Sequence, residues 1–118
     1  MKTNQEIFDQ VASYLLNQNK RSTNEYLCRY HGPDGLKCAV GCLIPDDDYV
    51  PEMEGVLSCL MQDYKEVMSK IGLDYYEHYY FLHKLQICHD KYEPEEWKNE
   101  LKIIAEEYKL DPAVLEKF

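Results

Sequence analysis

The sequence contains no apolar run that approaches the roughly 18 residues required for a membrane-spanning helix. Its first ten residues, MKTNQEIFDQ, are polar and lack the apolar stretch of a secretion signal. The five cysteines are an odd number and are spread along the chain, which does not favour a disulfide framework. We therefore expect a cytosolic protein with reduced thiols that binds no membrane.

Positive charge is scarce, because 13 lysines and arginines stand against 22 acids and give a net charge of −9. A surface of this sign repels phosphate, so direct binding to nucleic acid is disfavoured and a basic partner would be attracted. Five of the acids fall in residues 46–54, which hold no base. The alternative explanation is that the charge serves solubility alone.

Glycine and proline are few, with five of each in 118 residues, and they are unevenly placed. Residues 32–55, here called the central segment, hold four of the glycines and three of the prolines. This density predicts a tightly turned segment around which helices pack. The chain is long enough for one domain with one core, so we expect residues 1–118 to form a single domain.

The flanking sequence has helical periodicity. Thr3 and Glu6 form a capping box before an apolar face, which predicts a helix over residues 4–17. From Met53 to Ile71 the apolar residues alternate at spacings of four and three, which predicts one long helix that begins near Pro51. The apolar seam of that helix could serve the core or a homodimer.

Two more helices follow, one beginning at Asp74 and one with Pro94 in its first turn. Residues 27–30 and 36–38 flank a Gly-Pro-Asp-Gly turn and could pair as a short hairpin. The fold class expected is mainly α: a compact bundle of about four to five helices with a short β-hairpin near residues 27–38.

Two closely spaced pairs suggest a zinc site. Cys28 and His31 lie three residues apart, and Cys38 and Cys42 lie four apart. The six residues between His31 and Cys38 are fewer than the usual finger spacing, and buried cysteines are also common as small apolar residues. No cofactor or metal is assigned from this pattern.

A thiol nucleophile is a second alternative, in which a cysteine meets a histidine oriented by Asp90. The candidates are Cys38, Cys42 and Cys88 with His78, His83 and His89, and Cys38 with His89 is the pair carried forward. Adjacent residues such as His89 and Asp90 are not expected to face one another on a helix. No phosphate-binding loop, serine elbow or HExxH pattern is present, so no catalytic residue is assigned.

The acidic segment, residues 46–54, is the third candidate site. Pro45 and Pro51 break the alternating-ligand pattern of a calcium loop. The segment therefore predicts a docking surface for a basic protein, unless its acids only complement a helix N-terminus. The residues expected to bind protein are Asp46, Asp47, Asp48, Tyr49, Glu52 and Glu54, with Tyr49 as the aromatic anchor.

The run Cys38-Ala39-Val40-Gly41-Cys42-Leu43-Ile44-Pro45-Asp46 resembles the C-A-x-G-x-L-I-P-D motif of a group of small accessory proteins from tailed-phage genomes. Further matches are Gly32, Gly35, Tyr49, Glu54 and Gly55, and later Leu85, Gln86, His89, Asp90 and Trp97. The position of His31 is often arginine in that group, which weakens a zinc site. The resemblance implies a setting, the bacterial cytoplasm during infection, but no activity.

These observations favour a non-enzymatic accessory protein that binds and modulates a host bacterial protein, in counter-defence or host takeover. The alternatives are a small thiol- or metal-dependent enzyme that uses Cys38 and His89, and a self-assembling structural protein.

Overall fold

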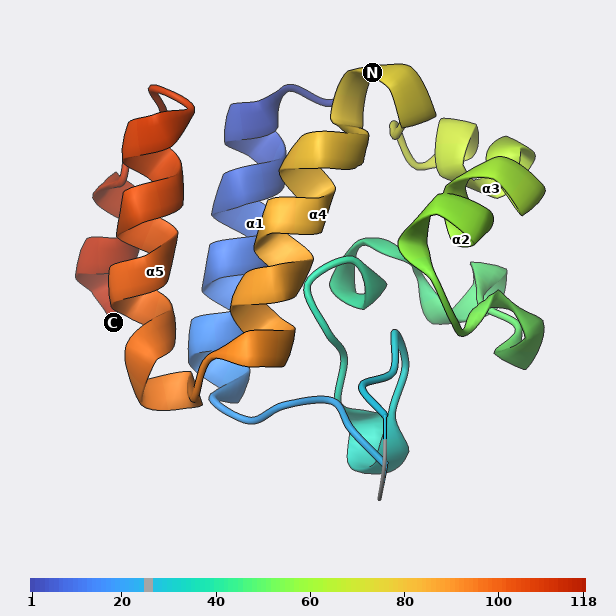
Figure 1. The fold of residues 1–118 in the computed structure, drawn as a ribbon, viewed down its shortest axis with the longest axis horizontal. Coiled ribbons are helices and arrows are strands. Elements are labelled where there is room, and N and C mark those ends of the chain that lie inside the picture. Colours follow the sequence, from blue (N-terminus) through green and yellow to red (C-terminus); the bar gives the residue numbers. More distant parts are fainter. Residues whose placement is uncertain (25–26) are drawn as a thin grey trace.

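The computed structural model describes residues 1–24 and 27–118. This part of the chain forms five α-helices, with an irregular stretch between the first and the second helix of the sequence (Figure 1). The helices are α1 (Asn4–Gln18), α2 (Leu57–Asp63), α3 (Lys65–Lys70), α4 (Tyr75–Lys91) and α5 (Pro94–Glu107). Short 3-10 turns cover Pro33–Gly35, Gly41–Leu43, Asp46–Asp48, Pro51–Met53 and Ala113–Lys117. The mainly α bundle expected from the sequence is confirmed.

Helices α1, α4 and α5 pack against one another, and α2 and α3 lie on the other side of α4 (Figure 1). Helix α4 contacts α1, α2 and α5, while α1 also contacts α5 and the Gly41–Leu43 turn. The central segment lies below α2 and α3 and beside the C-terminal half of α4 (Figure 1). Helix α4 is thus the element on which both halves of the molecule pack.

The helix starts follow the expected capping chemistry. Thr3 accepts a hydrogen bond from the Glu6 amide, and the Glu6 carboxylate accepts one from the Thr3 amide. Asp74 accepts from the Glu77 amide at the start of α4, and Pro94 occupies the first turn of α5. Because these caps satisfy amides that helices leave unpaired, local sequence alone determines where these helices begin.

The prediction of one long helix from Pro51 to Ile71 is wrong. Residues 51–53 form a separate 3-10 turn, Gly55 has a φ of 131°, and Tyr64 interrupts the remainder between α2 and α3 with φ −115° and ψ 39°. The seam residues pack into or against this chain's own core. The apolar seam therefore contributes to the core of this chain.

The expected hairpin is reduced to isolated bridges. Thr23 pairs with Cys28 and His31 with Lys37, and no strand longer than one bridge forms in residues 1–24 and 27–118. The turn between them is as expected, because Asp34 and Gly35 both have a left-handed φ. Hydrogen bonds between side chains and the backbone stabilise this region, and a β-ladder does not.

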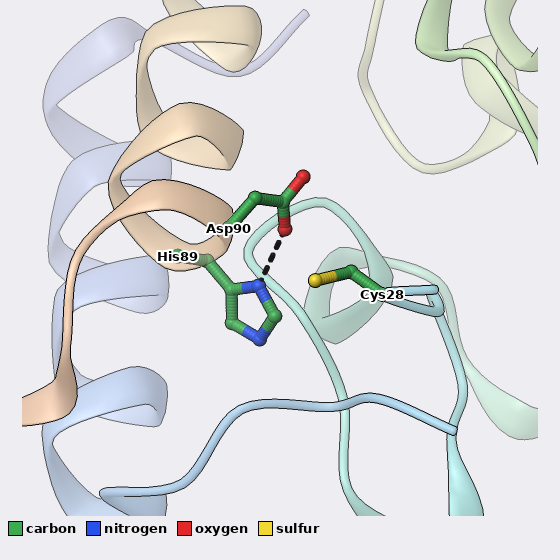
Figure 2. A group of neighbouring side chains, drawn as sticks. All are labelled: Cys28, His89 and Asp90. Carbon is green, nitrogen blue, oxygen red and sulfur yellow. Dashed lines mark hydrogen bonds and ion pairs between the residues drawn. The ribbon is translucent and has the colours of Figure 1, made fainter. Parts of the chain in front are cut away.

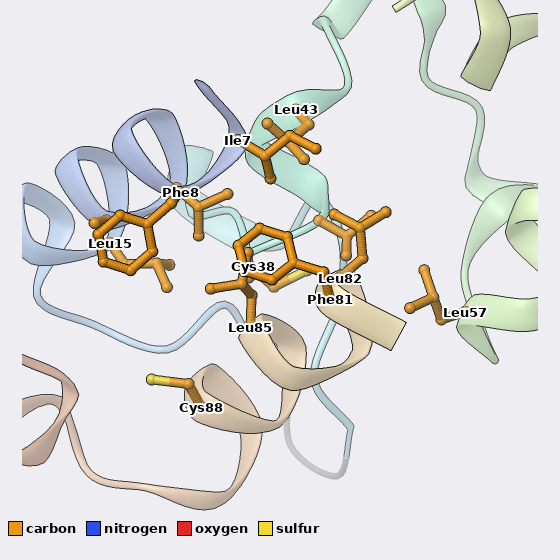
Figure 3. Close-up of a cluster of buried hydrophobic side chains, with 14 of the residues drawn as sticks. Ile7, Phe8, Leu15, Cys38, Leu43, Leu57, Phe81, Leu82, Leu85 and Cys88 are labelled. Carbon is orange, nitrogen blue, oxygen red and sulfur yellow. The ribbon is translucent and has the colours of Figure 1, made fainter. Parts of the chain in front are cut away.

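The core joins both halves of the molecule (Figure 3). Ile7, Phe8 and Leu15 of α1 and Phe81, Leu82 and Leu85 of α4 are all at most 2% exposed. Cys38 and Leu43 bring the central segment into the same cluster. Burial of this many apolar side chains is the main stabilising term of a domain of this size.

Among the helices of the described residues, none has both the length and the apolar character needed to cross a bilayer.

Candidate functional site: the central segment and the Cys28–His89–Asp90 cluster

Glu54 ties the central segment to the chain that precedes it. Its carboxylate accepts hydrogen bonds from the amides of Tyr30 (2.8 Å) and His31 (3.1 Å) and from the Tyr49 hydroxyl (2.6 Å). The Glu54 side chain is only 15% exposed. Such charge-assisted bonds are stronger than neutral ones, so Glu54 has a structural role.

His31 holds the next turn. Its Nε2 lies 2.9 Å from the carbonyl oxygens of both Gly41 and Ile44, and its ring stacks on Tyr49 at 4.2 Å between centroids. Since carbonyl oxygens only accept, Nε2 carries a proton and donates it.

The four residues considered for zinc do not converge. The Cys38 sulfur accepts from the Gly41 amide, and the Cys42 thiol donates to the Ala39 carbonyl. His31 is engaged with the two carbonyls named above. In residues 1–24 and 27–118, the one group spaced for a metal ion combines Cys28 with residues of α4 instead. The spacing of these four residues in the sequence therefore reflects their separate packing contacts.

The acids of the acidic segment differ in their contacts. Asp46 pairs with Lys37 at 3.0 Å and Asp48 with Lys70 at 2.8 Å. Asp47 and Glu52 are exposed and have no hydrogen bond or ion pair to any residue in the described ranges. Of the six residues expected to bind protein, Tyr49 and Glu54 are engaged internally and the Asp48 side chain is only 15% exposed, whereas Asp46, Asp47 and Glu52 belong to the outer face of the segment.

A cluster that the sequence analysis did not assemble lies where the chain before the central segment meets the end of α4. The Cys28 sulfur, a His89 ring nitrogen and an Asp90 carboxylate oxygen all lie within 4.8 Å of one another. Figure 2 shows the Cys28 thiol directed toward the other two side chains. Cys28, and not Cys38, is therefore the thiol of this cluster.

His89 and Asp90 touch in spite of being adjacent on a helix. His89 Nδ1 lies 2.7 Å from Asp90 Oδ1, whereas the sequence analysis expected these side chains not to face one another. Nδ1 is the ring nitrogen nearer to its own backbone, so a short carboxylate on the next residue can reach it sideways. The expectation was wrong because it considered the direction of the Cβ atoms alone.

The tautomer of His89 follows from its second partner. Nε2 accepts a hydrogen bond from the Ser22 amide at 2.9 Å, so the proton of the neutral ring is on Nδ1 and is donated to Asp90. The imidazole is fully buried and stacks on Trp97. Both nitrogens are occupied, which leaves His89 no free nitrogen to act as a base toward Cys28.

The tautomer with the proton on Nδ1 of His89 disfavours metal binding by Cys28, His89 and Asp90. A metal on Nδ1 would displace its proton to Nε2, where it would face the N–H of Ser22. Histidine ligands normally donate their second N–H to an acceptor, and Ser22 presents a donor there. The three residue types suit a transition metal, but the surroundings of His89 do not.

Asp90 is held as an ionised group. Burial alone would raise its pKa, but hydrogen bonds from His89, Gln86 and Cys28 outweigh burial and lower the pKa. The Gln86 amide donates to Asp90 Oδ1 at 2.9 Å, and the Gln86 oxygen accepts from the Val40 amide. The carboxylate is thus fixed in position through contacts with two other segments.

The cysteines near this region are poor nucleophiles. Burial, together with the charge and hydrogen bond of Asp90, raises the pKa of the Cys28 thiol to about 11. Burial likewise raises the pKa of Cys42 and Cys88 to about 12, and Cys38 is shifted further in the same direction. A catalytic thiol needs the opposite shift, so the environment disfavours thiol catalysis at neutral pH.

Alkylation tests this environment. At pH 8 we expect iodoacetamide to modify Cys28 about tenfold more slowly than the exposed Cys59. A thiol pKa of about 11, against an ordinary value of 9.0, lowers the thiolate fraction about 100-fold. The more basic thiolate is about tenfold more nucleophilic, which offsets part of this loss. Timed quenching followed by peptide mass spectrometry measures both rates. Faster alkylation of Cys28 than of Cys59 would contradict this account and indicate an activated thiol.

Beside the cluster lies a cleft of about 250 Å³. Its lining includes Cys28, Val56, Tyr79, Gln86, Ile87 and Asp90. The cleft separates α4 from residues 28–30 and from residues 55–57, which directly follow the acidic segment. It is smaller than the roughly 300–1,000 Å³ of sites for drug-sized ligands, so it suits a single side chain or a small molecule.

Two tyrosines of α4 are unusually exposed. Tyr76 is 90% exposed and Tyr80 is 76% exposed, while Tyr79 between them is half-buried and stacks on His83. The Tyr79 and His83 side chains also line the cleft. Exposed tyrosines supply much contact area at a low entropic cost, so this face of α4 has the composition of an interface.

In comparisons with known proteins, no family model matches the chain, and no curated protein or solved structure matches it either.

Proposed function

We propose that this chain is a non-enzymatic accessory protein that binds a basic surface of a bacterial host protein through its acidic segment. The observation that carries the proposal is that Asp47 and Glu52 are exposed and unpaired with any described residue, on a chain with a net charge of −9. Clustered charge of one sign steers a partner of the opposite sign and fixes its orientation.

Two further observations support binding rather than catalysis. The thiol beside His89 and Asp90 has a raised pKa, and His89 has both nitrogens engaged. The resemblance of the central segment to tailed-phage accessory proteins supports a setting in the cytoplasm of an infected bacterium, where the bound host protein would be modulated. The seam from Met53 to Ile71 packs within the chain, which removes the observation that favoured self-assembly.

Affinity capture tests the proposal. We expect tagged protein to retain a host protein in stoichiometric amount from bacterial lysate, and Asp47→Lys with Glu52→Lys to abolish retention. Both side chains are exposed, so the double substitution leaves the internal bonds of Glu54 and Tyr49 intact. Retention should also fall as salt rises, since exposed charges are screened.

A matched control separates the acidic segment from total charge. Asp63→Lys with Glu106→Lys makes the same change in net charge at two other exposed acids and should leave retention unchanged. Equal loss in both double variants would indicate nonspecific charge attraction. Absence of any retained protein, at low salt and in lysate of infected cells, would refute the proposal.

A further inference from the structure

The cleft beside Cys28 presents a carboxylate whose two oxygens differ. Asp90 Oδ1 already accepts from His89 Nδ1 at 2.7 Å and from Gln86 Nε2 at 2.9 Å. A carboxylate offers about two acceptor sites on each oxygen, so Oδ1 is saturated. In Figure 2 the second oxygen points away from the imidazole. The third donor to the carboxylate is the Cys28 thiol, which is a weak donor.

This asymmetry selects the kind of cation that Asp90 can bind. A guanidinium group binds carboxylates best through two parallel hydrogen bonds, which needs both oxygens. An ammonium group is a compact charge that needs only one. The apolar walls of the cleft, which include Val56, Leu57 and Ile87, suit the alkyl stem of such a group.

We propose that the cleft binds the side chain of a lysine from the partner protein, with the ammonium group on the Asp90 oxygen that accepts from neither His89 nor Gln86. The cleft opens directly after the acidic segment, since Gly55, Val56 and Leu57 line it. A partner drawn to residues 46–54 would therefore bring its basic side chains to this opening. The identity of the occupant as a partner's lysine rests on the proposed function.

The other charges that line the cleft are compatible with this occupant. The Arg29 guanidinium lies 3.9 Å from the Glu54 carboxylate, which offsets its charge. Lys91 is exposed at the end of α4, where its ammonium group can extend into water. Lys91 nonetheless weakens the attraction of the cleft for a cation. Replacing Lys91 with a neutral residue therefore tests whether the cleft favours a positively charged group.

Titration of the isotope-labelled full chain with n-butylammonium tests the inference by NMR. We expect shifts centred on Gln86, Asp90 and Cys28, with a dissociation constant on the order of 1 mM for so small a probe. Asp90→Asn should weaken binding at least tenfold, because it removes the charge but keeps an oxygen that accepts from His89 and Gln86. Asp63→Asn removes one negative charge at an exposed position outside the lining of the cleft and should leave binding unchanged.

Lys91→Met should strengthen binding about twofold, because it removes a nearby like charge. Weaker binding in Lys91→Met would overturn the inference, since it would show that attraction to a negative charge does not hold the ammonium probe in the cleft. Equal binding of neutral butanol would also overturn it, as would tighter binding of n-butylguanidinium. These experiments need no partner protein. The inference can therefore fail while captured host protein still supports the proposed function, and the proposed function can fail while the cleft still binds an ammonium group.

Discussion

Replacing Gly41 with alanine is expected to destabilise the protein by more than about 4 kcal/mol, a loss that only a few kinds of substitution produce. A β-carbon at this position would overlap the Tyr30 carbonyl group and lie 2.8 Å from the Tyr30 α-carbon. Both obstacles are backbone, so no change of rotamer relieves the overlap. The loss approaches the total stability of an ordinary small domain.

Urea denaturation followed by circular dichroism measures this effect. Gly35→Ala is the matched control, because Gly35 has a φ of 75° but nothing lies within 4 Å of an added β-carbon. That variant should lose only about 1–2 kcal/mol, the cost of a left-handed conformation in a residue other than glycine. Equal stability of the two variants would mean that Gly41 does not approach Tyr30 as closely as described.

His89→Ala is expected to cost about 3 kcal/mol of unfolding free energy. The substitution leaves a cavity against Trp97 and deprives the buried Ser22 amide of its acceptor. It also removes a hydrogen bond to Asp90. The loss should therefore appear as a lower urea midpoint with an unchanged slope.

The control for this prediction is His83→Ala, on the exposed side of the same helix. We expect its effect to stay within about 0.5 kcal/mol, as for most surface positions. A loss below about 1 kcal/mol in His89→Ala would show that the hydrogen bonds of His89 contribute little to folding. The structural role assigned to its two nitrogens would then be wrong.

The contacts of the acidic segment affect how its function is tested. The sequence presents Glu54 as one more acid beside Asp46 and Glu52, yet its carboxylate binds two backbone amides. Reversing its charge would disturb the fold as well as the surface. Asp47 and Glu52 are therefore the informative positions for binding experiments.

Local signals in the sequence determined most of the helices. The capping residues Thr3 and Asp74 and the proline at position 94 mark where α1, α4 and α5 begin. The two caps accept from amides of their own first turn, and the proline has no N–H to leave unpaired. The turn at Asp34 and Gly35 was predictable for the same reason. Interactions between residues a few positions apart can be read without knowledge of the fold.

Tertiary contacts decided the rest. The periodicity from Met53 to Ile71 favoured one helix, but the bonds of Glu54 to Tyr30 and His31 hold the chain extended just before Gly55. Helix propensity contributes tenths of a kcal/mol per residue, and several charge-assisted bonds outweigh it.

The cluster of Cys28, His89 and Asp90 joins positions about sixty residues apart, and the bond between Ser22 and His89 joins positions 67 apart. Spacing in the sequence paired Cys28 with His31, and Cys38 was the thiol expected beside His89. The composition determined the charge of the protein, and apolar periodicity with capping residues determined its helical class. Only the folded chain decided which thiol lies beside His89, which acids remain unpaired, and that Asp90 lines a cleft, because each depends on contacts between distant segments.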